Sequence, residues 1–271
     1  MAVAAVDAVI KLGGDVLSAP AVDLAAAEIA RARAAGRRLV VVHGGGPQTT
    51  ELSKRLGIEP QIVGGRRITD AAALDVVKMV VAGRLNVDLV AALRAAGVPA
   101  VGLSGSSGVV RAHRRPPRAV SGSGGAAVDF GLVGDVDGFD RPLLDALDTA
   151  GYLPVIACLG AGAAGETLNI NADVVASQLA AALGAEALVA CTAVGGVRRD
   201  KDDPATRLAR LTVAEARAAI AGGVVQGGMI PKLEEAFAPL EAGVGAVHVV
   251  APGEIAASLA APGSVGTLLV A

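Results

Sequence analysis

The chain has 271 residues, of which 53% are hydrophobic, 18% are charged and only 1% are aromatic, and its net charge is −2. This length suits one large α/β domain or two small lobes, with a core packed from Ala, Val and Leu. The weak net charge and the scarcity of stacking aromatics argue against a nucleic-acid or anionic-membrane surface. We find no signal peptide and no uncharged run of about 18 apolar residues, so we expect a cytoplasmic protein.

Short apolar runs alternate with longer amphipathic stretches along the chain. The runs predicted to form strands are Ala8–Leu12, Leu39–His43, Ala100–Leu103, Leu153–Ala157, Glu186–Thr192 and Ala246–Val250. They are almost continuously apolar, as parallel strands are when helices cover both faces of their sheet. The alternation therefore predicts a doubly wound α/β sheet with right-handed crossovers, whose natural halves are residues 1–160 and 161–271.

Helix start and stop signals lie between these strands. The predicted helices cover residues 47–57, 69–97 and 171–184, and another begins at the capping-box spacing of Thr212 and Glu215. Pro239 should kink or stop the helical stretch that follows Lys232. The Gly- and Ser-rich region 116–138 reads as hairpins and loops added to the main sheet.

A few polar and reactive residues have simple structural interpretations. The basic cluster Arg111–Arg118 contains two prolines, which favours a solvated loop. Cys158 and Cys191 lie in apolar runs and are expected to be buried free thiols. Two cysteines and three scattered histidines do not make a metal site, so none is assigned.

Three glycine clusters adjoin strands or helix starts, at residues 13–14, 44–46 and 227–228. Glycine lets backbone N–H groups close on an anion, and a helix N-terminus adds positive potential. Lys11 and Lys232 flank the first and last clusters and supply full positive charge. A single cluster could be only a turn, but the set favours a site that holds phosphoryl oxygens. A Walker sequence and the protein-kinase signatures are absent, so this is neither of those classes.

The segment 168–173 places Asn169, Asn171 and Asp173 at the start of a helix. One of these residues could serve as a helix cap, but capping does not require all three. A carboxylate within reach of two lysines would fix their ammonium groups by charge-assisted hydrogen bonds. Arg66 and Arg67 precede the helix at residue 69, and either could clamp a substrate carboxylate or simply be solvated.

Taken together, these segments resemble the amino acid kinase superfamily, and within it the N-acetylglutamate kinases. The matching segments, in chain order, are residues 11–14, 42–47, 65–70, 83–86, 102–105, 131–135, 168–173 and 227–232. The ordered set covers nearly the whole chain and is specific, above all in Leu-Asn-Ile-Asn-Ala-Asp and Gly-Gly-Met-Ile-Pro-Lys.

The resemblance implies a three-layer αβα sandwich with a mainly parallel central sheet. It implies that residues 1–160 bind the acyl amino acid, that residues 161–271 bind ATP, and that ATP with Mg²⁺ phosphorylates the side-chain carboxylate of N-acetyl-L-glutamate. The catalytic residues would be Lys11, Lys232 and Asp173, with phosphate contacts from Gly13, Gly14 and Gly45. The acceptor would contact Gly45, Gly46, Arg67, Asn169 and Asn171, and the nucleotide Thr192, Val197, Gly227 and Met229.

The resemblance leaves alternative functions open. Ala193 stands where the family usually has an aspartate near the nucleotide, and this departure keeps open a non-catalytic sensor of amino-acid derivatives. A kinase for a carrier-protein-linked aminoadipate or glutamate also remains open and would need a wider, more basic entrance, which the Arg111–Arg118 cluster could supply although its two prolines favour a loop. Aspartokinase and carbamate kinase are weaker matches. We expect a homodimer joined through the helix at residues 69–97.

Overall fold

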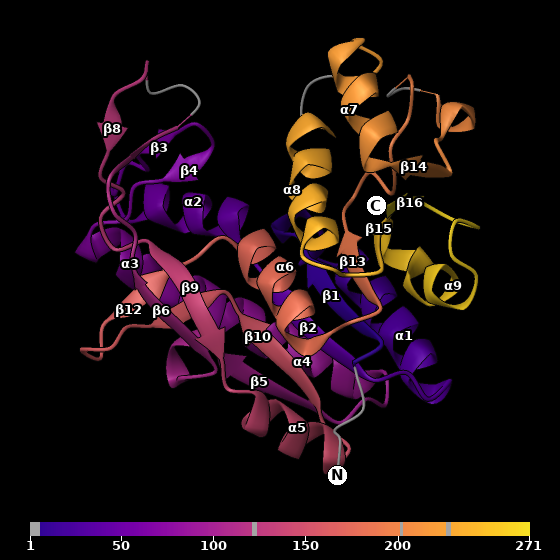
Figure 1. Cartoon of the computed structure of the whole chain (residues 1–271). Coiled ribbons are helices and arrows are strands. Elements are labelled where there is room, and N and C mark those ends of the chain that lie inside the picture. Colours follow the sequence, from indigo (N-terminus) through magenta and orange to yellow (C-terminus); the bar gives the residue numbers. More distant parts are fainter. Residues whose placement is uncertain (1–5, 121–123, 201–202, 226–228) are drawn as a thin grey trace.

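The structure is a computed structural model that describes residues 6–120, 124–200, 203–225 and 229–271, without the side chains of Pro204, Met229, Pro231 and Lys232. An eight-stranded sheet with the order β14-β16-β15-β13-β1-β2-β10-β5 runs through the middle of the molecule (Figure 1). Its strands are β1 (Ala8–Leu12), β2 (Leu39–His43), β5 (Ala100–Ser104), β10 (Leu153–Ala157), β13 (Ala187–Cys191), β14 (Arg210–Thr212), β15 (Ala246–Val250) and β16 (Thr267–Val270).

Neighbouring strands of this sheet are parallel except for β15 and β16, which are antiparallel. The six predicted strands are confirmed to within one residue at either end. Strands β1, β2, β10 and β13 have almost entirely buried side chains, which explains why their sequences are continuous apolar runs.

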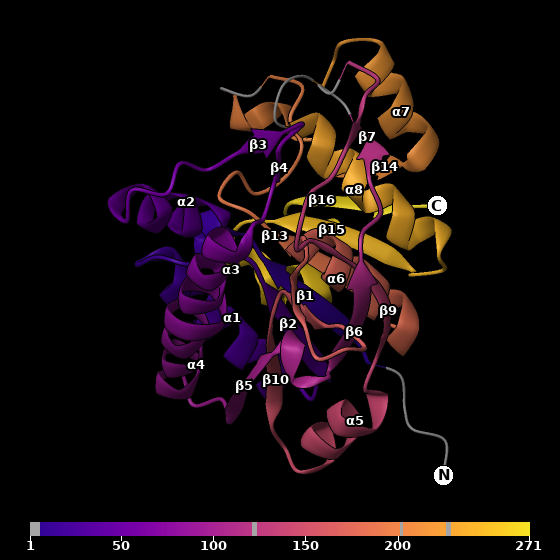
Figure 2. The same ribbon diagram turned by 90° about the vertical axis from the view of Figure 1, so that its left-hand side faces the viewer.

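Helices cover both faces of the sheet. They are α1 (Ala21–Ala34), α2 (Gly46–Arg55), α3 (Ala71–Val77), α4 (Asn86–Ala95), α5 (Arg141–Thr149), α6 (Ala172–Leu183), α7 (Val213–Ala221), α8 (Met229–Glu241) and α9 (Ile255–Ala260), with 3₁₀ turns at Gly14–Val16, Gly105–Ser107, Pro204–Thr206 and Pro252–Glu254. Figure 2 shows α1 and α4 on one side of the sheet and α6 with α8 on the other. The predicted αβα sandwich is therefore confirmed.

A second, four-stranded sheet packs beside α6, which contacts its strand β9. It has the order β12-β11-β6-β9, and its strands are β6 (Val110–Arg114), β9 (Gly134–Phe139), β11 (Leu159–Ala161) and β12 (Thr167–Asn169). Two small hairpins accompany it, β3 (Ile62–Val63) with β4 (Arg66–Arg67), and β7 (Arg118–Ala119) with β8 (Ala127–Val128). The β7–β8 hairpin agrees with the hairpins predicted for residues 116–138, but β9 was not anticipated.

The predicted helix at residues 69–97 is one continuous helical stretch with an irregular middle. The Asp70 side chain caps α3 by accepting the N–H of Ala73 at 2.8 Å. Between α3 and α4, residues Lys78–Leu85 form a π-helix, whose wider turn shifts the positions of all later side chains. Asn86 follows this segment and is buried, 6% exposed.

Two further helix predictions had opposite outcomes. The capping box of Thr212 and Glu215 at the start of α7 is confirmed. Pro239 does not stop α8, which runs on to Glu241. The proline removes only one N–H donor close to the end of the helix, and buried side chains such as Leu233 and Phe237 hold α8 against the core. Among the described residues, no helix combines the length and the apolar character needed to cross a membrane.

Candidate active site

The largest collection of predicted site residues lies at the carboxyl-terminal edge of the parallel strands. The strands β1, β2 and β13 end side by side there, because Leu12 is in register with both His43 and Cys191. A cavity of about 470 Å³ opens at this edge. In open α/β sheets this edge is the usual place for a ligand. The predicted residues that line the cavity are Lys11, Gly13, Gly14, Gly45, Gly46, Arg67, Asn169, Asn171 and Asp173.

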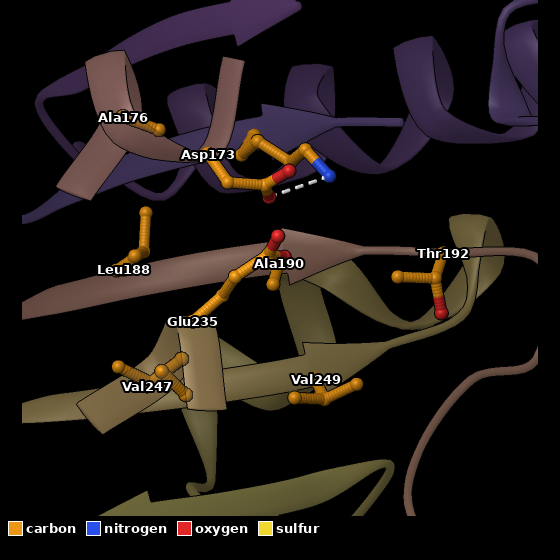
Figure 3. A pocket seen from close by; sticks show the side chains of 10 residues that line it. Asp173, Ala176, Leu188, Ala190, Thr192, Glu235, Val247 and Val249 are labelled. Atoms are coloured by element: carbon orange, nitrogen blue, oxygen red, sulfur yellow. Dashed lines mark ion pairs between the residues drawn. The ribbon is translucent and has the colours of Figure 1, made fainter. Parts of the chain in front are cut away.

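Lys11 and Asp173 form an ion pair inside this cavity. Lys11 Nζ lies 2.7 Å from Asp173 Oδ1, and the two side chains are 13% and 25% exposed. Figure 3 shows Asp173 reaching toward the ammonium group from the start of α6. Burial lowers the pKa of Lys11, but the charge and hydrogen bond of Asp173, with smaller contributions from Glu235 and Asp15, leave that pKa above its ordinary value. Lys11 is therefore a fixed positive charge at neutral pH.

Two helix N-termini point backbone N–H groups at the same cavity. Asn171 caps α6 by accepting the N–H of Asp173 at 2.8 Å. Gly45 is the N-cap residue of α2, and Pro47 occupies its first turn. The first N–H groups of a helix have no partner within it, and the helix dipole adds positive potential there. Both ends therefore favour a bound anion.

The glycines of the cavity leave no room for larger residues at two positions. A Cβ atom on Gly14 would lie 2.7 Å from Cδ of Pro47, at the start of α2. A Cβ atom on Gly45 would collide with Leu85 and lie 3.1 Å from Cγ2 of Val81, both in the π-helical segment. Glycine is therefore needed at both positions. It lets the turn after β1 approach α2, and the turn after β2 approach the π-helical segment.

Arg67, in β4, and Asn169, at the end of β12, both line the cavity. Arg67 Nη2 donates to Thr50 Oγ1 at 2.6 Å, whereas its Nη1 atom is buried and has no hydrogen-bond partner among the described residues. Asn169 Nδ2 donates to Thr69 Oγ1 at 3.1 Å. An unused, buried N–H group is costly unless a ligand accepts it. This supports a carboxylate at Arg67.

His43 ends β2 next to the glycine turn but is not available as a base. It is fully buried, its Nδ1 atom lies 3.0 Å from the Gly44 carbonyl oxygen, and its Nε2 atom lies 2.9 Å from Asn86 Nδ2. Because the amide of Asn86 donates to Nε2, the ring carries its proton on Nδ1 and donates it to Gly44. Burial lowers the pKa of His43 to about 4, so the ring is neutral at pH 7.

The residues predicted to contact the nucleotide do not line one common cavity. Thr192 lines a smaller cavity of about 30 Å³ that shares Lys11, Asp173 and Glu235 with the larger one (Figure 3). Val197 is fully buried, donates its N–H to Thr267 Oγ1 at 2.8 Å and lines neither cavity.

Three further predictions fall where the structure describes little or nothing. Gly227 lies outside the described residues. Met229 and Lys232 belong to α8, but their side chains lie outside the described part. At the position of the missing family aspartate, the N–H of Ala193 donates to Asp15 Oδ2 at 3.1 Å. A carboxylate from the turn after β1 therefore lies beside this position.

Three residues that line the larger cavity were not among the predicted site residues. Glu235, in α8, lines both cavities and lies near Lys11 (Figure 3). The prediction of a solvated loop at Arg111–Arg118 was wrong, since β6 occupies its first half and Arg115 is only 5% exposed. Arg115 and Arg118 both line the cavity. The available sequence signal was the alternation of apolar and polar residues that begins at Val110, and the two prolines that follow obscured it.

Comparisons with known proteins agree with this fold. The model of the amino acid kinase family matches residues 8–251. The acetylglutamate kinase of Sorangium cellulosum is 55% identical over 97% of this chain and 94% of its own length, and that of Anaeromyxobacter dehalogenans is 53% identical over 97% and 98%. Among solved structures, a protein of Streptococcus mutans UA159 superposes with a TM-score of 0.76 at 28% identity, over 97% of this chain and 98% of that one.

Proposed function

The chain belongs to the amino acid kinase family, and from this membership we propose that it transfers the γ-phosphoryl group of ATP to the side-chain carboxylate of N-acetyl-L-glutamate. The product is N-acetylglutamyl 5-phosphate, an intermediate for arginine biosynthesis. The observation that carries the proposal is the ion pair of Lys11 and Asp173 in a cavity that also contains glycine turns, two helix N-termini and Arg67.

The nucleophile of this reaction needs no general base. A glutamate side chain has an ordinary pKa near 4.3, so it is an anion at neutral pH. This fits a site whose nearest histidine, His43, is buried, neutral and hydrogen-bonded at both nitrogens. The obstacle is instead the approach of an anion to the polyanionic triphosphate, which positive groups must overcome.

In the proposed step, a carboxylate oxygen of the acceptor forms a bond to the γ-phosphorus of ATP while the bond from that phosphorus to the β–γ bridging oxygen breaks. ADP leaves with the bridging oxygen, and no proton needs to move. Lys11 and the N–H groups of Gly14 and Gly45 would stabilise the negative charge that spreads over the phosphoryl oxygens, whereas the N–H of Gly13 donates to the Cys191 carbonyl oxygen at 3.3 Å. Asp173 would hold the Lys11 ammonium group in place, and from the sequence we assign Lys232 to the same task from α8.

The acceptor's other end would lie toward Arg67. The Nη1 atom of Arg67 is buried and has no hydrogen-bond partner among the described residues. It suits the α-carboxylate, since a guanidinium binds a carboxylate through two parallel hydrogen bonds. Asn169, Asn171 and the N–H groups of Gly45 and Gly46 would contact the remaining polar atoms. We further propose that residues 1–160 mainly bind the acceptor and residues 161–271 mainly ATP, with Thr192, Val197, Gly227 and Met229 near the nucleotide.

The residues present fit a triphosphate better than a metal held by the protein alone. Backbone N–H groups at two helix starts and the Lys11 ammonium group suit phosphate oxygens. Within the described ranges, no group of three or more His, Cys, Asp or Glu residues could hold a metal ion. Mg²⁺ would therefore reach the site on the ATP phosphates, where it would neutralise part of their charge.

The test is an assay of ADP release with MgATP and a panel of acceptors. We expect turnover with N-acetyl-L-glutamate, weaker turnover with N-acetyl-aminoadipate, and a loss of at least about 100-fold in kcat for Lys11→Met. Lys54→Met is the matched control, because Lys54 is an exposed lysine of α2 outside both cavities.

Two outcomes would replace the proposal. Binding of N-acetyl-L-glutamate without turnover at saturating MgATP would favour the sensor. Turnover only with a carrier-linked acceptor would favour the related kinase.

A further inference from the structure

Positive side chains line the larger cavity from its opening to its floor. They are Lys11, Arg66, Arg67, Arg115 and Arg118. Two of them are neutralised by ion pairs, Lys11 with Asp173 at 2.7 Å and Arg115 with Asp135 at 2.6 Å. Arg66 and Arg118 are exposed, and neither makes an ion pair or a side-chain hydrogen bond with any described residue. The exposed end of the cavity therefore carries two positive charges that are not directly paired with a carboxylate of the described residues.

These two arginines lie close together although they come from different hairpins. Arg66 is in β4 and Arg118 is in β7, and the β3–β4 and β7–β8 hairpins lie side by side at one end of the molecule (Figures 1 and 2). Desolvation and the positive charges of Arg115 and Arg66 lower the pKa of Arg118, although the negative charge of Asp135 opposes them. Like charges at such proximity oppose folding, so their placement suggests a role in binding an anion.

The next positive group inward is Arg67, adjacent to Arg66 in β4. It is less exposed than Arg66 or Arg118, and its buried Nη1 group has no hydrogen-bond partner in the part of the chain that the structure describes. An anion bound at Arg66 and Arg118 would therefore lie near the more buried guanidinium of Arg67, whose Nη1 group can still donate a hydrogen bond. Guanidinium groups suit carboxylates, which accept hydrogen bonds from their planar donor fork.

We propose that Arg66 and Arg118 form a mouth site, defined by these two residues, that captures the acceptor by its α-carboxylate and passes it to Arg67. The inference rests on the proposed function and adds to it how the dianionic acceptor is selected. The two charges attract the acceptor as it enters and, at longer range, after it has bound deeper in the cavity, but they do not touch the reacting carboxylate. The effect of the mouth site should therefore fall on kcat/KM rather than on kcat, and salt should screen it.

The test compares Arg66→Gln, Arg118→Gln and the double variant at low and high salt. We expect each single substitution to lower kcat/KM for N-acetyl-L-glutamate about three- to tenfold at low salt, with kcat within about twofold of the wild type. The decrease of kcat/KM with added salt should become shallower in each variant. Arg118→Lys keeps the charge and should retain most of the wild-type kcat/KM and its salt dependence.

Controls separate this role from a structural one. Arg94→Gln removes an exposed arginine of α4 that lines neither cavity, and it should leave kcat/KM unchanged. Since Arg66 and Arg118 repel each other, Arg118→Gln should leave Tm unchanged or raise it, whereas loss of a structural residue would lower it. Wild-type kcat/KM and salt dependence in the double variant would overturn the mouth site while leaving the proposed function intact.

Calorimetric binding of N-acetyl-L-glutamate without ATP provides a readout that does not depend on turnover. We expect the double variant to bind at least about threefold more weakly than the wild type at low salt. Equal affinity in both would overturn the mouth site even if the wild type proved to be inactive as a kinase. Absence of turnover in the wild type, with this difference in binding present, would instead contradict only the proposed function.

Discussion

Asp173, in the first turn of α6, places its Oδ1 atom 2.7 Å from the Nζ atom of Lys11 in β1. The contact joins the carboxyl-terminal end of a central strand to the start of the helix that crosses over it. The position of Asp173 also stabilises α6, because a carboxylate in the first turn interacts favourably with the helix dipole. One side chain thus serves both the local helix and the charge at the cavity.

Asp173→Asn keeps the size of the side chain but removes its charge. We expect kcat to fall about 100- to 1,000-fold, because Lys11 loses the partner that fixes its ammonium group and offsets its burial. Steady-state kinetics at saturating substrates measures this loss. Asp75→Asn is the control, since Asp75 pairs with Lys78 on the exposed side of α3 and should have little effect. A kcat equal to the wild type would contradict the role of Asp173.

Gly45 and Gly46 offer a matched pair of substitutions in one turn. Gly45→Ala places a methyl group against Leu85 and Val81, so we expect the free energy of unfolding to fall by about 1–3 kcal/mol. A Cβ atom on Gly46 meets no heavy atom within 4 Å, so Gly46→Ala should leave stability within about 0.5 kcal/mol. Urea unfolding measures both. Equal stability of the two variants would contradict the tight packing of the π-helical segment against Gly45.

The sequence predicted those parts of the fold that depend on local pattern. The strands β1, β2 and β10 are apolar throughout because both of their faces are buried. The strand β9 reads Gly-Asp-Val-Asp-Gly-Phe and is only partly buried, so its composition resembles a loop. The π-helical segment also has no local signal, since it depends on packing of the long helix against the glycine turn.

The site could be predicted only where a motif brings its own geometry. Asn171 and Asp173 were placed at a helix start from the sequence, but their roles at the site were implied by the family resemblance of residues 168–173. Arg115 and Arg118 were assigned to a loop, because their place at the cavity follows from how β6 and the β7–β8 hairpin pack in three dimensions. Glu235 was missed for the same reason, since one carboxylate in an amphipathic helix reads as a solvated residue.

The two cysteines provide a test of the core around the site. Burial raises the pKa of Cys158 and of Cys191 to about 12, and both are free thiols. Because the thiolate is the reactive form, we expect iodoacetamide to label neither residue in the native protein at pH 7.5 during the time that labels both in urea. Mass spectrometry of the alkylated protein measures this. Native labelling at the rate of the unfolded chain would show that the strands β10 and β13 do not bury their ends.

The homodimer expected from the family resemblance can be tested on the long helix. Met79 and Val87 are large apolar residues on it that are 53% and 64% exposed. If this helix joins two subunits, Met79→Lys combined with Val87→Lys should convert the dimer to a monomer, because two unpaired charges would be buried. Sedimentation equilibrium measures the mass. Leu24→Lys, at a similarly exposed position of α1, is the control and should leave the dimer intact. A wild-type monomer would contradict the expectation directly.

The buried histidines make stability depend on pH in a direction that can be worked out. Burial lowers the pKa of His43 and of His248 to about 4 in the folded protein, whereas an unfolded chain has a histidine pKa near 6.5. Below pH 6.5 the unfolded chain therefore binds protons that the folded protein does not, and the free energy of unfolding falls as the pH drops from 6.5 toward 4. Above pH 6.5 these two groups cause no further change.

Each histidine should cost about 2 kcal/mol of stability on going from pH 7 to pH 5. Urea unfolding at the two pH values measures the difference, which should be about half as large in His248→Gln, where one titrating group has been removed. His248 is suited to this test because it lies in β15 and lines neither cavity, so the substitution leaves the candidate active site unchanged. A pH dependence in the variant equal to that of the wild type would contradict this prediction. It would mean that the pKa of His248 is the same in the folded protein as in the unfolded chain.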